Sequence, residues 1–268
     1  MRLVLFFSLL GCSDYQVHST TSDGSAPGRS PDADDALVDT GDPADDDAIL
    51  LEPPPAEVPD QKVYLHTGSS LYSWNPTTGA LTIIGDFFRD DSGELEAITD
   101  IAIDGDGRFY GVSYTTLYGI DAYTAEIWPI SPLDFPLYGL TCTYEGRIIG
   151  GGDGLYEIDP MAGTVTTLVD SGQYQTSGDL VGLPDGLLYW AVRGGDDLVV
   201  VDPDSGVSAA RGEIGVEAIY GLGYADGSLY GFTDAGQVLD IDPSTGQVTR
   251  TASLPGNWWG ATTNPAVW

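Results

Sequence analysis

The sequence has few basic residues, and this scarcity limits the partners that it can have. It contains nine Lys plus Arg against 41 Asp plus Glu, which gives a formal charge of -32 over 268 residues. A field of that sign repels nucleic-acid phosphates and anionic lipid head groups, so we expect no nucleic-acid partner. The acidic surface favours solubility, or the binding of a cation or a cationic partner.

Cysteine, histidine and long apolar runs are also scarce. Cys12 belongs to the N-terminal apolar segment and Cys142 to a predicted strand, so we expect no disulfide and interpret Cys142 as a small buried hydrophobe. His18 and His66 have no Cys or His neighbour at ligand spacing, which argues against a zinc site. Serine-nucleophile motifs and phosphate-binding glycine loops are absent too.

The N-terminus has the pattern of an export signal. Arg2 precedes an apolar run over residues 3–10, which is much shorter than the roughly 20 residues that a membrane-spanning helix needs. Leu9-Leu10-Gly11-Cys12 resembles the bacterial lipobox, in which the cysteine is lipidated and becomes the mature N-terminus. The resemblance implies a signal peptide over residues 1–11 and a stable acyl anchor on Cys12. An ordinary secretory signal with a chance cysteine is the alternative.

Ser13, directly after the cysteine, and the acidic segment that contains it indicate where the protein is sorted and how it is attached. Ser13 at that place resembles the outer-membrane sorting signal of enterobacterial lipoproteins, so we expect an exported outer-membrane lipoprotein that faces the periplasm or the cell surface. Residues 12–61 are rich in Asp, Ser, Thr, Pro and Gly. Such a segment buries too little apolar surface to fold, so the sequence predicts a disordered acidic linker that holds the following domain away from the membrane.

The rest of the chain contains internal repeats. Five segments align on an apolar strand, and in the first four this strand is followed by a polar turn and an aromatic-rich strand. Their equivalent residues are separated by 39, 40, 42 and 39 positions, and they are Ile101, Leu140, Leu180, Leu222 and Ala261. This interval is the length of four short strands with their turns.

A second turn closes the third strand of each repeat. It begins with Asp or Asn, usually has Pro next, and ends with Gly, as in residues 75–79, 159–163, 202–206 and 242–246. These residue types suit a tight turn, so we interpret the leading acids as structural. The segment 121–126 departs from the pattern because it keeps the Asp but lacks both Pro and Gly.

The two ends of the repeat region complement each other. Residues 63–84 match the second, third and fourth strands of a repeat, and residues 258–263 match a first strand. Pairing the two would complete one sheet and leave no exposed strand edges in the ring. The sequence therefore predicts an all-β, five-bladed β-propeller over residues 62–268. A linear solenoid is the alternative, but it needs no such complementarity.

The repeat itself resembles those of bacterial propellers of the pyrroloquinoline-quinone-like and related extracellular types. The resemblance is clearest at residues 239–249, where Leu is followed by Asp-Pro-x-Thr-Gly-x-Val-Thr. It implies the fold and an extracellular compartment. Quinone-dependent dehydrogenases of this shape have more blades and further cofactor residues, which are not found here, so we expect no cofactor.

A ligand site is expected where the innermost strands begin, because propellers usually bind ligands at one mouth of the central channel. The first position there holds Thr99, Tyr138, Gly178, Tyr220 and Trp259, next to Trp258, and one step inward lie Asp100 and Asp179. We predict ligand binding by Tyr138, Tyr220, Trp258, Trp259, Asp100 and Asp179. The alternative is that the aromatic residues wedge neighbouring blades apart and the acids cap strand amides.

Three functions remain open at this stage. The first is a monomeric propeller without enzymatic activity that binds a partner protein or a glycan at the aromatic mouth. The second is a carbohydrate-active hydrolase or lyase in which Asp100 and Asp179 act as acid and base, as carboxylates do in five-bladed glycosidases. The third is a scaffold that binds through its outer faces. Asp100 and Asp179 could also hold Ca²⁺ together with backbone oxygens.

Overall fold

The computed structural model describes residues 62–91, 93–170, 172–193 and 197–268. The predicted signal peptide, Cys12 and the predicted linker lie outside these residues. In the part of the chain that is described, no helix is both long enough and apolar enough to cross a membrane.

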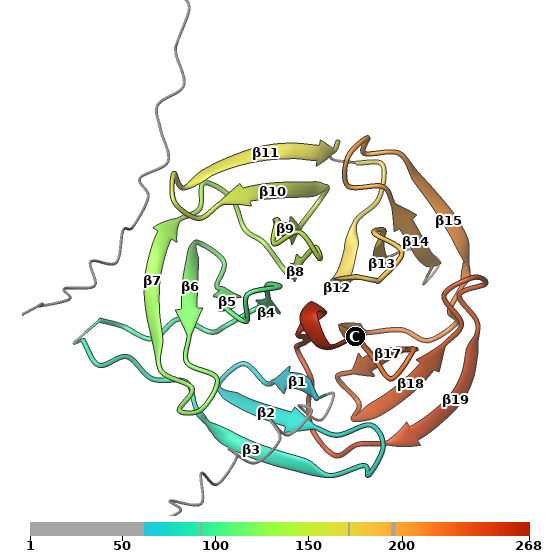
Figure 1. Cartoon of the computed structure of the whole chain (residues 1–268), viewed down its shortest axis with the longest axis horizontal. Helices are drawn as coiled ribbons and strands as arrows, with labels where there is room; N and C mark the ends of the chain where they lie inside the picture. The colour runs from blue at the N-terminus through green and yellow to red at the C-terminus, as the bar shows by residue number, and fades with distance from the viewer. Residues whose placement is uncertain (1–61, 92, 171, 194–196) are drawn as a thin grey trace, which may run out of the picture. The chain divides into compact units, whose positions relative to one another are not determined.

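The described residues form five four-stranded antiparallel sheets, which surround a common centre as the blades of a propeller (Figure 1). Blade 1 contains β20 (Gly260–Thr263), β1 (Val63–His66), β2 (Ser70–Trp74) and β3 (Leu81–Asp86). Blade 2 contains β4 (Asp100–Ile103), β5 (Phe109–Val112), β6 (Thr116–Ile120) and β7 (Ile127–Pro132).

The other three blades each use four consecutive strands, written here from the innermost to the outermost. Blade 3 contains β8 (Gly139–Cys142), β9 (Ile148–Gly151), β10 (Leu155–Asp159) and β11 (Thr164–Val169). Blade 4 contains β12 (Thr176–Gly182), β13 (Leu188–Val192), β14 (Asp197–Val201) and β15 (Ser208–Glu213). Blade 5 contains β16 (Ile219–Ala225), β17 (Ser228–Thr233), β18 (Gln237–Ile241) and β19 (Val248–Ser253).

The two ends of the propeller meet in blade 1. Strand β20 pairs antiparallel with β1, in a register that places Val63 opposite Thr263 and His66 opposite Gly260. The last strand of the chain is thus the innermost strand of the blade that the first strands began. The predicted five-bladed fold and its closure by terminal strands are confirmed.

The core lies between the blades. Each pair of neighbouring blades encloses one cluster of buried apolar side chains, so five clusters surround the centre. Trp190 is fully buried between blades 3 and 4, and Phe232 between blades 5 and 1. Cys142 is a free, buried thiol between blades 2 and 3, as predicted, and burial raises its pKa well above the usual value. Apolar burial between blades holds the ring together.

The irregular turn of blade 2 keeps the geometry of the other four. The Ala125 amide donates to the Asp121 carbonyl at 2.9 Å, as the glycine amides do in the equivalent turns. Asp121 Oδ1 accepts the amides of Tyr123 and Thr124. Ala125 has a φ of 63°, so an alanine occupies the left-handed region that glycine occupies elsewhere. The leading acids are structural, as the sequence indicated.

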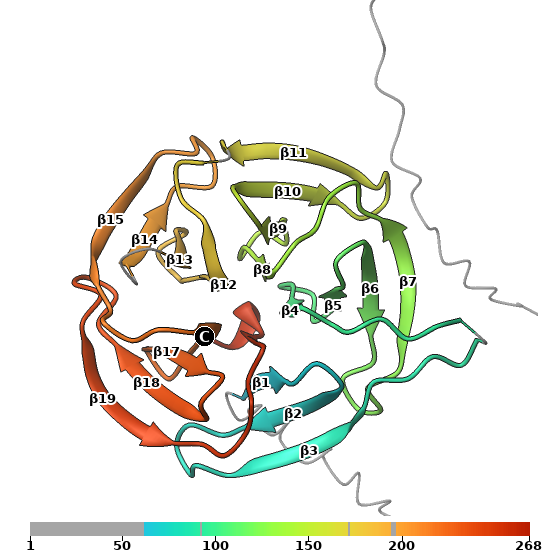
Figure 2. The ribbon, with the colours of Figure 1, turned by 180° about the vertical axis from the view of Figure 1, so that it is seen from behind.

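A short 3-10 helix, η1 (Pro265–Val267), follows β20 at the end of the chain. It lies near the centre of the ring in both views (Figures 1 and 2). Trp268 makes ring contacts with Tyr144 of blade 3 and Tyr224 of blade 5, at centroid distances of 6.4 and 6.0 Å. The C-terminal residues therefore connect three blades at the end of the channel to which β20 runs.

Candidate ligand-binding site

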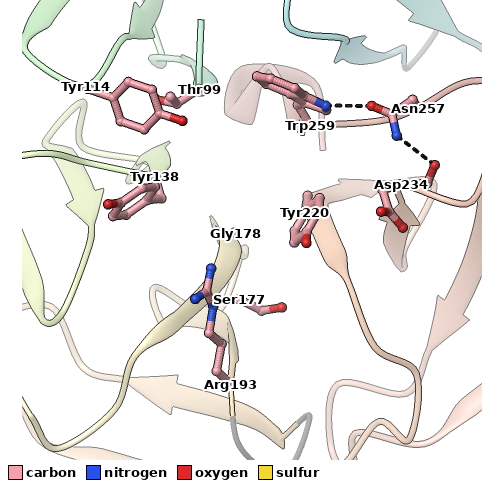
Figure 3. Close-up of a pocket in the computed structure, with 10 residues that line it drawn as sticks. All are labelled: Thr99, Tyr114, Tyr138, Ser177, Gly178, Arg193, Tyr220, Asp234, Asn257 and Trp259. Atoms are coloured by element: carbon pink, nitrogen blue, oxygen red, sulfur yellow. Dashed lines mark hydrogen bonds between the residues drawn. The ribbon is translucent and has the colours of Figure 1, made fainter.

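A cavity of about 440 Å³ opens where the innermost strands begin (Figure 3). Its lining includes the first position of all five repeats, which is occupied by Thr99, Tyr138, Gly178, Tyr220 and Trp259. The structure thus brings Tyr138, Tyr220 and Trp259 together on one cavity, where the sequence placed them. The remaining lining residues are Tyr114, Ser177, Arg193, Asp234 and Asn257.

The Trp259 ring is held in place from two directions. Its indole N–H donates to Asn257 Oδ1 at 2.6 Å, and the Asn257 amide in turn donates to the Asp234 carbonyl at 3.0 Å. The six-membered ring packs against Gly68, where an added Cβ would lie 2.9 Å from Cζ3. The Trp259 backbone amide also donates to the His66 carbonyl at 2.9 Å. The ring is therefore oriented before any ligand arrives, which reduces the entropic cost of binding.

Tyrosines form the other aromatic walls of the cavity. Tyr138 is 40% exposed and meets Tyr114 in an edge-to-face pair with centroids 5.8 Å apart. Tyr220 lies directly against Gly178, which leaves no space for a side chain at that position. These rings offer apolar faces together with hydroxyl groups that can form hydrogen bonds.

Two charged side chains also face this space. Arg193 follows β13 in blade 4, and Asp234 lies between β17 and β18 in blade 5. The cavity can therefore hold a ring-shaped ligand by stacking, and it offers one cationic and one anionic partner for polar substituents.

Asp100 and Asp179 lie in a layer beneath the cavity, and they are not among the residues that line it. Both are fully buried. Asp100 accepts the amide of Ile101 at 2.8 Å and that of Leu140 at 2.6 Å. Asp179 accepts the amides of Leu180, Leu222 and Ala261. The five donors are the equivalent first-strand residues of the five repeats, so two carboxyl groups satisfy one converging N–H from every blade.

The remaining blades have glycine where these acids stand. Gly139, Gly221 and Gly260 occupy the equivalent positions, and a Cβ on Gly260 would collide with Asp100 Oδ1 and His66 Nε2. The centre of the ring has room for two carboxyl side chains and for no more. The two acids thus cap strand amides, which is the alternative to ligand binding that the sequence analysis gave for them.

The two carboxyl groups also act on each other at the centre of the ring. Burial and the Asp179 charge raise the pKa of Asp100 well above its usual value. Burial raises the pKa of Asp179 to about 8, although Asp100 and the three amides lower it. The pair therefore holds a proton at neutral pH, and the two carboxyl groups share it.

His66 completes this buried layer, and the sequence offered no signal for it. Its Nδ1 donates to the Thr67 carbonyl at 2.8 Å, and its Nε2 lies 3.8 Å from Asp100 Oδ1. Burial lowers the pKa of His66 to about 4, so the ring is neutral at neutral pH. The two acids are thus surrounded by five amide N–H donors and by an imidazole whose unprotonated Nε2 faces Asp100. Apart from the two carboxyl groups, the described residues of this layer offer no oxygen ligand of the kind that Ca²⁺ takes.

Trp258 does not share the cavity with Trp259. It is 1% exposed, its indole N–H donates to the Leu254 carbonyl at 3.0 Å, and its ring meets Tyr72 edge to face. Adjacent residues of an extended chain point to opposite sides, so the two tryptophans could not both face the channel. Trp258 belongs to the core between blades 5 and 1.

Comparisons with known proteins identify the fold. No family model matches the chain, and no curated protein matches it in sequence. The solved nidogen/laminin complex contains a similar chain, with a TM-score of 0.56 and 13% identity, covering 77% of this chain and 82% of that one. Streptogramin B lyase gives a TM-score of 0.47 at 15% identity, covering 74% of this chain and 66% of the lyase chain.

A third similar structure is glutaminyl cyclase from Myxococcus xanthus, with a TM-score of 0.44 and 22% identity, covering 62% of this chain and 69% of the cyclase chain. At such identities the similarity concerns the fold alone. The chain is a five-bladed β-propeller. This fold is one that forms binding and interaction domains.

Proposed function

We propose that this protein is an exported lipoprotein, anchored through Cys12, whose propeller binds a glycan in the aromatic cavity. The observation that carries the proposal is the orientation of Trp259, which Asn257 and Gly68 hold in place at the cavity wall. A rigid indole suits the apolar face of a sugar ring, and the hydroxyl groups of Tyr138 and Tyr220 suit its polar edges. A cavity of about 440 Å³ is within the range of small-ligand sites.

The anchor is the part of this proposal that rests on sequence alone. The lipobox-like Leu9-Leu10-Gly11-Cys12 supports it, and the acidic segment that follows would give the propeller reach beyond the membrane. Wild-type protein should partition with membranes, and Cys12→Ala should release it. Equal membrane recovery of the two proteins would contradict the anchor without affecting the ligand site.

The geometry favours binding over hydrolysis by Asp100 and Asp179. An inverting pair needs roughly 6.5 to 9.5 Å between its carboxyl groups to admit a water molecule, and a retaining pair about 5 to 5.5 Å. Here the two groups are fully buried, and five backbone amides donate to them. A substrate in the cavity would not reach them.

A glycan array followed by titration calorimetry tests the site. Trp259→Ala should weaken binding by about 30-fold, because a well-packed Trp contributes on the order of 2 kcal/mol at a binding hot spot. Tyr138→Ala and Tyr220→Ala should weaken binding by smaller factors. Tyr123→Ala is the matched control, since this residue is 91% exposed in the outer turn of blade 2.

Unchanged binding by Trp259→Ala would overturn the proposed site. Capture of an envelope protein, with no glycan bound, would favour the partner-protein alternative. The scaffold alternative would be favoured if the cavity variants still bind the partner and substitutions on the outer strands abolish that binding.

A further inference from the structure

Arg193 lines the cavity, apart from the other five arginines that the structure describes. Four of those five form ion pairs with carboxylates of their own surroundings, as expected in a chain with 41 acidic residues, and Arg211 on β15 forms none with the described residues. The pairs are Arg89 with Asp91 at 2.6 Å, Arg108 with Asp104 at 3.2 Å, Arg147 with Glu157 at 2.7 Å, and Arg250 with Asp240 at 3.7 Å. Within the described residues no carboxylate forms an ion pair with Arg193.

The place of Arg193 in the fold directs its side chain to the cavity. The residue directly follows β13, whose five residues are all buried, and its amide donates to the Gln175 carbonyl at 2.8 Å. In Figure 3 the guanidinium extends toward the opening that Tyr138, Tyr220 and Trp259 surround. The base of the side chain is thus fixed, and its charged end lies where a ligand would sit.

The chemistry of the Arg193 guanidinium group indicates which ligands the cavity can bind. The planar fork of Arg matches a carboxylate with two parallel hydrogen bonds, and such charge-assisted bonds are about twice as strong as neutral ones. Asp234 is the other charged residue of the lining, so the cavity has one positive and one negative partner. A monoanionic ligand would pair with Arg193, and its hydroxyl groups could donate to Asp234. A ligand with several negative charges would be repelled by Asp234 and by the net charge of -32.

We propose that the cavity is selective for an acidic sugar, a hexuronate unit whose carboxylate binds Arg193 while its ring stacks on Trp259. This inference rests on the proposed glycan-binding function and adds the chemical class of the ligand. Neutral sugars share the stacking and hydroxyl contacts but offer the Arg193 guanidinium no charged partner.

The test compares two probes that differ only in the carboxylate, methyl glucuronoside and methyl glucoside, by calorimetry or ligand-observed NMR with the full-length chain. Wild type should bind the glucuronoside at least about tenfold more tightly, since a hydrogen bond to a charged group contributes roughly 1.5 to 3 kcal/mol. Arg193→Gln should abolish this preference, so that the variant binds the two probes with similar affinity. Arg193→Lys, which keeps the charge and loses the fork, should show an intermediate preference.

Arg211→Gln is the matched control, because it removes the same charge from an exposed position on β15, outside the cavity lining. It should keep the full preference. Thermal unfolding of each variant checks that folding is intact, and since Arg193 is exposed, we expect little change.

Two outcomes would overturn the inference, and only the second would also contradict the proposed glycan-binding function. If wild type binds both probes equally and Trp259→Ala weakens both, the acidic-sugar class is wrong and glycan binding stands. If neither probe nor any arrayed glycan binds, the proposed function fails as well.

Discussion

Two successive layers of the inner strands use the same repeat in different ways. At the first position, blades 1 to 5 present Trp259, Thr99, Tyr138, Gly178 and Tyr220, which line an open cavity. One residue further, the chain has two aspartates and three glycines, and both aspartates are fully buried. The upper layer varies because it faces an open cavity, where side chains of different size fit. The lower layer is restricted because five N–H groups converge on a centre that water does not reach.

Substitutions in the two layers should therefore reduce the free energy of unfolding by different amounts. We expect the largest loss at Asp179. Its carboxyl group accepts three amides, one more than that of Asp100. Asp179→Asn keeps the shape, but it has one acceptor oxygen and turns an NH₂ group toward N–H donors. We expect a loss of about 3 to 5 kcal/mol in the free energy of unfolding, measured with urea.

Asp100→Asn is the matched variant in the same layer. Asp100 accepts two amides, so an asparagine can still accept one of them and turn its NH₂ group toward Asp179. Its loss should be clearly smaller than that of Asp179→Asn. Equal losses, or none, would show that the number of accepted amides does not set the loss of stability.

The second effect is on the pH dependence of stability. Between pH 7 and 8 the unfolded chain has both carboxyl groups ionised, whereas the folded protein still holds protons on the pair. The folded state then binds more protons, so stability falls as pH rises. We expect a fall of about 1 to 2 kcal/mol across this window in urea titrations.

His66 does not contribute to this slope. Its folded pKa of about 4 and its ordinary value of 6.5 both lie below the window, so it is mostly neutral in both states. Its own effect, a loss of stability on acidification, falls between pH 6.5 and 4. Asp100→Asn should give a shallower slope from pH 7 to 8. A slope that is identical in wild type and variant would place its source elsewhere.

The smallest effect on stability is expected in the upper layer. Tyr138 is 40% exposed and its described ring contact is with Tyr114, so Tyr138→Ala should cost about 1 kcal/mol or less. Urea unfolding beside the ligand titration provides both quantities. A large loss of stability would show that the cavity wall supports the ring, and the contrast between the two layers would disappear.

Much of the site could be predicted from the repeats, because the first-strand positions align across all five. The residues that were missed lie in loops, where the residue type differs from blade to blade. Tyr114, Arg193 and Asp234 each stand three residues after the second-strand partner of Ile101, Leu180 and Leu222, so the repeat places all three at the same mouth. A tyrosine, an arginine and an aspartate share no residue pattern, so the alignment alone did not mark them as site residues, and Asn257 lies outside this position, before β20. The interpretation of Trp258 as a cavity residue overlooked the alternation of side chains along an extended chain.

The amino-acid sequence by itself determined the blade length, the number of blades and their closure, because turn residues and strand hydrophobicity are local and repeat with the fold. It also determined that Tyr138, Tyr220 and Trp259 would share one end of the channel. Only the tertiary structure decided the roles of Asp100 and Asp179. Residues about 80 positions apart meet at the centre, and burial, a shared proton and amides from all five blades make them a structural pair.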